Sequence, residues 1–183
     1  MTSLLRFEQV ALRRGGRLLF EKLDLDLAPG EAVQVTGPNG SGKSSLIRLA
    51  AGLLRQDLGE VERSRLALAD DNLALDRELP LRRALRFWVV EADQAMHAAG
   101  IDHLADMPVR LLSSGQEKRA TLARVFASGA PLWLLDEPLN ALDADGVGRL
   151  SGMIEKHRAN GGAIVAASHQ QLAGDWRVLE LSS

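Results

Sequence analysis

Two short segments of the chain carry the side chains that phosphate chemistry requires. The first, GPNGSGKS at 37–44, fits the pattern G-x-x-x-x-G-K-[ST], which joins a strand to a helix through a glycine-rich loop. Its glycines let backbone N–H groups face phosphate oxygens, Lys43 offers a positive charge to the β and γ phosphates, and Ser44 can ligate Mg²⁺. We therefore predict a nucleoside triphosphate site made of Gly37, Pro38, Asn39, Gly40, Ser41, Gly42, Lys43, Ser44 and Ser45.

The second segment, LWLLDEP at 132–138, ends an apolar run in two adjacent acids. Sites in parallel sheets gather at the carboxyl ends of strands, so this pair is expected beside the phosphate loop. Asp136 would hold Mg²⁺, directly or through water. Glu137 would be the general base that orients and polarises the attacking water.

His169 closes another apolar run, AIVAASH, whose end would face the same cleft. It could contact the γ-phosphate there, and we include it with Glu137 and Lys43 as a candidate catalytic residue. Its position alone leaves a structural or surface role equally open. Such a role is assigned to the other three histidines: His97, His103 and His157.

A third segment, LSSGQEKRATLAR at 112–124, indicates a helix start with a second seat for an anion. Ser114 can cap this start, and Glu117 three residues later would complete a capping box. The segment lies far beyond Gly42 in the sequence. No argument within one chain brings it to the same phosphates.

A framework of strands and helices must position these segments. Alternation of apolar and charged residues predicts a half-buried strand in LLFEKLDLDLAPGE, and continuous apolar runs predict strands buried on both faces. The order of these elements argues for a mostly parallel α/β sheet. The further predicted strands are 32–37, 132–138, 163–169 and 176–181. The predicted helical stripes are Leu46, Ala50, Leu53 and Leu54; Leu81, Leu85, Trp88 and Val89; Ala92, Ala95, Met96 and Ala99; and Val147, Leu150 and Ile154.

Composition excludes several classes of protein. The 183 residues suffice for one α/β domain, and the net charge of -2 without a basic run gives no reason to expect nucleic acid. The absence of cysteine excludes disulfides, thiolate metal sites and cysteine nucleophiles, and it suits a reducing compartment. The first residues lack the apolar core of a signal peptide, and no apolar run approaches the roughly 20 residues that span a bilayer.

Taken in order, the segments resemble the nucleotide-binding domain of ATP-binding cassette (ABC) proteins over nearly the whole chain. The resemblance implies an α/β P-loop NTPase fold in a single domain, 1–183, that hydrolyses ATP with Mg²⁺. It also implies a mostly parallel sheet core with an N-terminal antiparallel β portion, at about 1–75 and 125–183, and a short inserted α-helical subdomain at about 76–124. The segments that carry it are 37–44, LSSGQ at 112–116, 132–137, NALD at 140–143, and His169.

The same resemblance implies a partner. ABC domains pair head to tail, and each ATP lies between the phosphate loop of one chain and the LSSGQ signature of the other. Ser113, Gly115 and Gln116 would then serve the γ-phosphate of the opposite chain, and Asp143 would pass information between the two sites. Such pairing closes into a homodimer.

A narrower similarity, carried by LRFW, ASHQQL and the long run from 113 to 147, is to the ATP-binding subunits of bacterial cytochrome c biogenesis. It implies the ATPase part of a haem exporter, peripheral on the cytoplasmic face of the inner membrane and held by multi-spanning membrane subunits, with no direct haem contact. The helix at 81–90 could receive such a subunit or be an ordinary amphipathic helix. A soluble assembly ATPase, for example in iron–sulfur assembly, is the alternative. Glu137 argues against a switch that barely hydrolyses ATP.

Two positions depart from the family pattern. Asn72, beside Asp70 and Asp71, stands where a Gln usually ligates Mg²⁺, and it keeps the amide on a side chain one methylene shorter. Arg14 stands where an aromatic ring usually stacks on adenine. A guanidinium can lie on a purine face, although an exposed arginine that holds adenine weakly is equally open.

Overall fold

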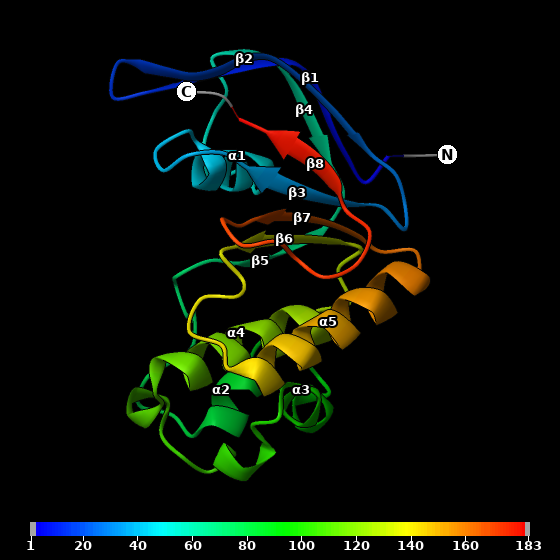
Figure 1. Ribbon diagram of the computed structural model, residues 1–183. Helices are drawn as coiled ribbons and strands as arrows, with labels where there is room; N and C mark the ends of the chain where they lie inside the picture. Colours follow the sequence, from blue (N-terminus) through cyan, green and yellow to red (C-terminus); the bar gives the residue numbers. More distant parts are fainter. Residues whose placement is uncertain (1–2, 182–183) are drawn as a thin grey trace.

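The computed structural model describes residues 3–181, which form two sheets with helices on both faces of the larger one (Figure 1). The smaller sheet is antiparallel, has the order β2-β1-β4, and consists of β1 (Leu5–Arg14), β2 (Arg17–Leu27) and β4 (Leu58–Arg63). The larger sheet is parallel and has the order β5-β6-β7-β3-β8. Its strands are β3 (Ala32–Thr36), β5 (Leu66–Ala69), β6 (Leu132–Asp136), β7 (Ala163–Ala167) and β8 (Arg177–Glu180).

This architecture confirms the predicted fold class. Every residue of β6 and β7 is buried, as their continuous apolar runs indicate, because helices cover both faces of the parallel sheet. In β2 the residues that alternate with charged ones, such as Phe20 and Leu25, face the interior.

Across residues 3–181, five α-helices connect the strands. They are α1 (Lys43–Ala50), α2 (Leu81–Arg86), α3 (Ala92–Ala99), α4 (Ser114–Ala127) and α5 (Ala144–Ala159), and single 3-10 turns occur at Asp102–Leu104 and Val109–Leu111. Helix α1 lies between the two sheets, and α4 and α5 cover the opposite face of the parallel sheet (Figure 1). The described part of the chain therefore has two apolar cores, one on each face of that sheet.

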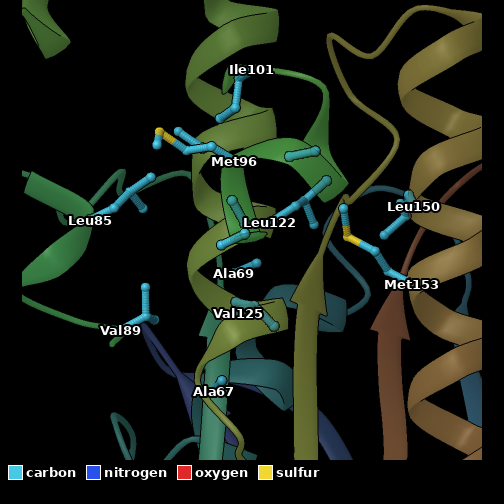
Figure 2. Packing of buried hydrophobic residues seen from close by; sticks show 14 of the residues in the cluster. Ala67, Ala69, Leu85, Val89, Met96, Ile101, Leu122, Val125, Leu150 and Met153 are labelled. Carbon is cyan, nitrogen blue, oxygen red and sulfur yellow. The ribbon is translucent and has the colours of Figure 1, made fainter. Parts of the chain in front are cut away.

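The inserted helices share one of these cores. Leu85 and Met96, from α2 and α3, pack in the same cluster as Leu122 of α4 and Met153 of α5 (Figure 2). Helix α4 therefore lies between the inserted helices and the sheet. Apolar contact is continuous from the inserted helices through α4 to the sheet, and the division of the chain into a core and a helical subdomain stays a prediction.

Two predicted helical stripes are longer than the helices that form. Helix α1 ends at Ala50, Gly52 follows in a left-handed conformation with φ 77°, and Leu53 is 61% exposed. Helix α2 ends at Arg86, so Trp88 lies beyond it, 47% exposed, with the Arg124 guanidinium 5.2 Å from its ring centroid. The stripes predicted in α3 and α5 agree with the structure.

Within residues 3–181, none of the helices combines the length and the apolar character that crossing a bilayer requires.

Candidate functional site

The phosphate loop delivers the first turn of α1 to the carboxyl edge of the parallel sheet. Gly42 precedes the helix with φ 105°, and no side chain caps the N-terminus of α1. The left-handed conformation explains the glycine, since a Cβ is strongly disfavoured there. The uncapped N–H groups of this turn form an anion seat.

Lys43 is folded back onto the loop that precedes it. Its ammonium donates to the carbonyl oxygens of Gly37, at 2.9 Å, and Pro38, at 3.0 Å, and the side chain is buried. The lysine thus braces the loop and keeps its charge beside the expected phosphates.

Ser44 and Asp136 meet across the gap between α1 and β6. The Ser44 hydroxyl donates to Asp136 Oδ1 at 3.0 Å. Burial raises the pKa of Asp136, and the hydrogen bond from Ser44 opposes that rise. A hydroxyl and a buried carboxylate at one point are the hard oxygen donors that Mg²⁺ prefers, so these two residues fit the predicted metal role.

Glu137 and His169 are also brought together. His169 Nδ1 lies 2.8 Å from Glu137 Oε2, and the Glu137 backbone N–H donates to the carbonyl of Ala167 at 2.8 Å. Glu137 adopts φ 44°, the left-handed region that residues with a Cβ rarely occupy. This conformation turns its carboxylate toward the end of β7.

A cavity of about 440 Å³ opens over this edge of the sheet. Arg14 reaches it from the β1–β2 hairpin and donates to the Ser45 hydroxyl at 3.4 Å. Leu19, which the sequence did not single out as a site residue, supplies an apolar wall; only its place on the alternating strand could have suggested it. The cavity is lined by Arg14, Leu19, Asn39, Gly40, Gly42, Lys43, Ser44, Ser45 and Glu137.

The start of α4 differs from the capping box that the sequence predicts. Ser113, in an extended conformation, is the N-cap: its hydroxyl accepts from the Gln116 backbone N–H at 3.4 Å, and Gln116 Oε1 accepts from the Ser113 backbone N–H at 2.9 Å. The prediction of Ser114 and Glu117 was wrong by one residue. Leu112 is buried, which sets the helix start, and Glu117 pairs with Arg77 at 3.3 Å instead.

The loop before α5 packs against this helix start. An added Cβ at Gly115 would lie 2.7 Å from the carbonyl oxygen of Ala141, so close approach of two backbones requires a glycine here. Asp143 caps α5 by accepting from the Gly146 backbone N–H at 2.9 Å and also pairs with Arg119. These two bonds, in that order, lower the pKa of Asp143.

The structure separates the predicted residues into two groups. Lys43, Ser44, Asp136, Glu137 and His169 converge at one edge of the sheet. The predicted partner-facing residues do not line the cavity of their own chain; these are Ser113, Gly115, Gln116 and Asp143.

Asn72 belongs to neither group. Its amide donates to Asp70 Oδ2 at 3.1 Å, and its backbone N–H donates to the other carboxylate oxygen at 3.0 Å. To ligate Mg²⁺, Asn72 would have to leave this carboxylate, and the metal role stays a prediction.

Lys118 is a further residue that the sequence did not single out. It lies on the buried face of α4, 8% exposed, and donates to the backbone carbonyl of Asp136 at 3.2 Å. The sequence signal for its burial is its helical spacing from the apolar Leu122 and Val125, which places the three residues on one face of the helix.

Comparisons with known proteins agree with this geometry. A family model described as ABC transporter matches residues 20–140. The cytochrome c biogenesis ATP-binding export protein CcmA of Sphingopyxis alaskensis is 55% identical, over 94% of this chain and 93% of its own. The protein of the same name from Novosphingobium aromaticivorans is 58% identical, over 90% of this chain and 87% of its own.

A solved structure of a dimeric ATP-binding cassette, bound to ADP and Pi after hydrolysis, superposes with a TM-score of 0.84. It is 21% identical to this chain and covers 97% of it, and the superposition covers 94% of that structure. At this identity the likeness concerns the fold.

Proposed function

Because the chain belongs to the ABC transporter family of ATP-binding proteins, we propose that it is the ATP-hydrolysing subunit of the haem exporter of cytochrome c biogenesis. The observation that carries the ATPase activity is that Lys43, Ser44 and Glu137 line one cavity at the edge of the sheet. Asp136 and His169 lie directly beside it, since Asp136 accepts from Ser44 and His169 contacts Glu137. The exporter branch rests on the relatives at 52–58% identity. Their names do not favour a soluble assembly ATPase.

Hydrolysis follows from what these side chains can do. The uncapped turn of α1 binds phosphate oxygens, and Lys43 exchanges its two carbonyl partners for the β and γ phosphates. Glu137 orients the attacking water and accepts its proton, while the imidazole of His169 holds the Glu137 carboxylate in place. When bound through Ser44 and Asp136, Mg²⁺ supplies charge stabilisation at the phosphates.

The homodimer completes the site. Each chain carries a phosphate-binding edge and, elsewhere, a signature helix start that is absent from its own cavity. A head-to-tail two-fold pair brings Ser113 and Gln116 of one chain to the nucleotide of the other and leaves no site unpaired. Asp143, already bonded to Arg119, lies on the loop that packs against the signature helix.

Membrane subunits dock on the segment between the inserted helices α2 and α3. Phe87 and Val90 are 83% and 92% exposed, and the Phe87 ring lies edge-on to Trp88 with 5.3 Å between centroids. We call Phe87, Trp88 and Val90 the apolar patch. Exposed apolar side chains grouped in this way mark a protein contact, and docking there would hold the chain at the cytoplasmic face of the inner membrane.

Turnover of Mg·ATP by the Glu137→Gln variant tests the ATPase assignment. Loss of the base should lower hydrolysis by about 10² to 10⁴. ATP binding should persist and trap a dimer detectable by size-exclusion chromatography. Glu155→Gln, an exposed acid on α5, is the control. Turnover near the wild-type rate would refute the role of Glu137.

Isolation from bacterial membranes tests the exporter assignment. The tagged chain should co-purify with multi-spanning subunits, and Phe87→Ser together with Val90→Ser should release it, whereas Leu58→Ser, an equally apolar exposed residue of β4, should not. Recovery of an exclusively soluble complex would favour an assembly ATPase.

A further inference from the structure

Lys118 is a buried lysine on α4 that the hydrolysis scheme does not use. Only 8% of the residue is exposed, and lysines are almost never buried to this degree unless they are paired. It projects from α4, lines a cavity together with Asp71, and reaches the end of β6. Desolvation by burial lowers its pKa, and the carboxylates around it oppose that shift, in the order Asp71, Asp136, Glu137 and Asp70.

The ammonium bonds to one particular peptide group. Its acceptor, at 3.2 Å, is the carbonyl oxygen of Asp136, which belongs to the peptide that joins Asp136 to Glu137. The N–H of the same peptide donates to the carbonyl of Ala167 at 2.8 Å. Both polar groups of this peptide are therefore held from opposite sides, by α4 and by β7.

The orientation of that peptide decides where the Glu137 carboxylate points. Rotation of the peptide plane changes ψ of Asp136 and φ of Glu137 together. The observed φ of 44° is unfavourable for a residue with a Cβ, so the surroundings must maintain it. Without a donor beneath the carbonyl, the peptide can rotate toward negative φ and carry the carboxylate away from His169.

We propose that Lys118 is a positioning residue for ATP hydrolysis: its ammonium fixes the peptide plane between Asp136 and Glu137 and so aims the Glu137 carboxylate. The inference rests on the proposed role of Glu137 as general base. It also connects the helix that begins at the signature residues with the hydrolytic edge of the same chain, through one side chain.

The test measures Mg·ATP turnover and nucleotide affinity of the full chain. Lys118→Met keeps the length of the side chain and removes the donor; it should lower kcat by about 10- to 100-fold, the effect of a small misplacement of a reacting group. The ATP dissociation constant should change less than about threefold, since the phosphate seat on α1 is untouched. Lys118→Arg, which retains a donor and a charge, should keep at least about a third of kcat. Lys156→Met on α5 is the control.

A double-mutant cycle separates positioning from stability. In the Glu137→Gln background, Lys118→Met should lower the residual single-turnover rate less than about threefold, because Lys118 acts through the carboxylate already removed. If Lys118→Met lowered the rate by the same factor in the Glu137→Gln background as in the wild type, the inference would be overturned. A wild-type kcat in Lys118→Met would also overturn it. So would equal losses of kcat in Lys118→Met and Lys118→Arg. Should Lys118→Met fail to fold, the same cycle with Lys118→Gln and Lys118→Arg decides the matter. A wild-type chain without turnover would overturn the proposed function instead.

Discussion

Helices α1 and α4 both begin at residues that the sequence assigns to ATP, and they begin differently. At α1 a left-handed Gly42 precedes the helix and no side chain accepts from the first N–H groups. At α4, Ser113 and Gln116 satisfy each other's backbone in a complete capping box. One helix start is open to a ligand, and the other is already satisfied by its own chain.

The difference shows how one chain can carry two halves of a site. An open helix end needs an anion to satisfy its donors and therefore binds one readily. A capped end is stable without a ligand, so the signature helix stays formed when no partner is present. Its side chains retain the Ser113 O–H and the Gln116 amide N–H₂ as donors for a second chain.

Removal of the positive charge at the uncapped start of α1 should give the largest loss of ATP turnover. Lys43→Ala deletes the donor to Gly37 and Pro38 and the cation for the phosphates, and we expect ATP turnover to fall by more than about 100-fold with loss of nucleotide binding. Isothermal titration with Mg·ATP measures the binding, and Lys156→Ala is the control. Retained binding would show that the open end is not the phosphate seat.

Mixing variants of the two ends tests whether the halves belong to different chains. Ser113→Arg should leave ATP binding to the monomer unchanged while blocking hydrolysis. An equal mixture of Lys43→Ala and Ser113→Arg chains forms about half heterodimers with one intact site each, so turnover should recover to at most about a quarter of wild type. If either variant alone hydrolysed ATP normally at dimer-forming concentrations, the shared-site arrangement would be wrong.

Thermal stability should fall when the N-cap of α4 is removed and should not change when its neighbour is substituted. Ser113→Ala removes the N-cap of α4 and should cost about 1 kcal/mol, which corresponds to a decrease in Tm of about 2–4 °C. Ser114→Ala, one residue along and exposed, should leave Tm unchanged. Calorimetry of the two variants decides between the observed cap and the one that the sequence suggested.

Asn72 should give the smallest change. Asn72→Gln keeps the amide and adds one methylene, so ATPase activity should be preserved or raised if this loop serves the metal. The longer side chain would alter the hydrogen bond between the amide and Asp70. Hydrolysis rates at several Mg²⁺ concentrations measure the effect on activity. Complete loss of activity would mean that the loop has another role.

Local patterns made the open end predictable. The spacing in 37–44 defines the loop without reference to distant residues, and the uninterrupted apolar run before Asp136 predicts a strand buried on both faces. Together they predict that Ser44 and Asp136 lie at one edge of the sheet, where their side chains form a hydrogen bond.

Other features depend on contacts that a pattern does not contain. The sequence pattern does not indicate strand β1, because a bulge at Gln9, with φ 47°, breaks the alternation of its apolar residues. Two adjacent serines, Ser113 and Ser114, can each cap a helix, and the buried Leu112 directly before them favours Ser113. From its residue type alone, Lys118 is indistinguishable from a solvent-facing lysine. Only the folded structure places the end of β6 beside it.

The fluorescence of Trp88 reports on the surroundings of the apolar patch. The chain has no tyrosine, so its ultraviolet emission comes from three tryptophans, of which Trp133 is buried against His157. Trp88 is 47% exposed and has a guanidinium over its ring. Shielding of this indole from water would shift its emission to the blue, so the native protein would report the proposed docking at the apolar patch without an attached dye.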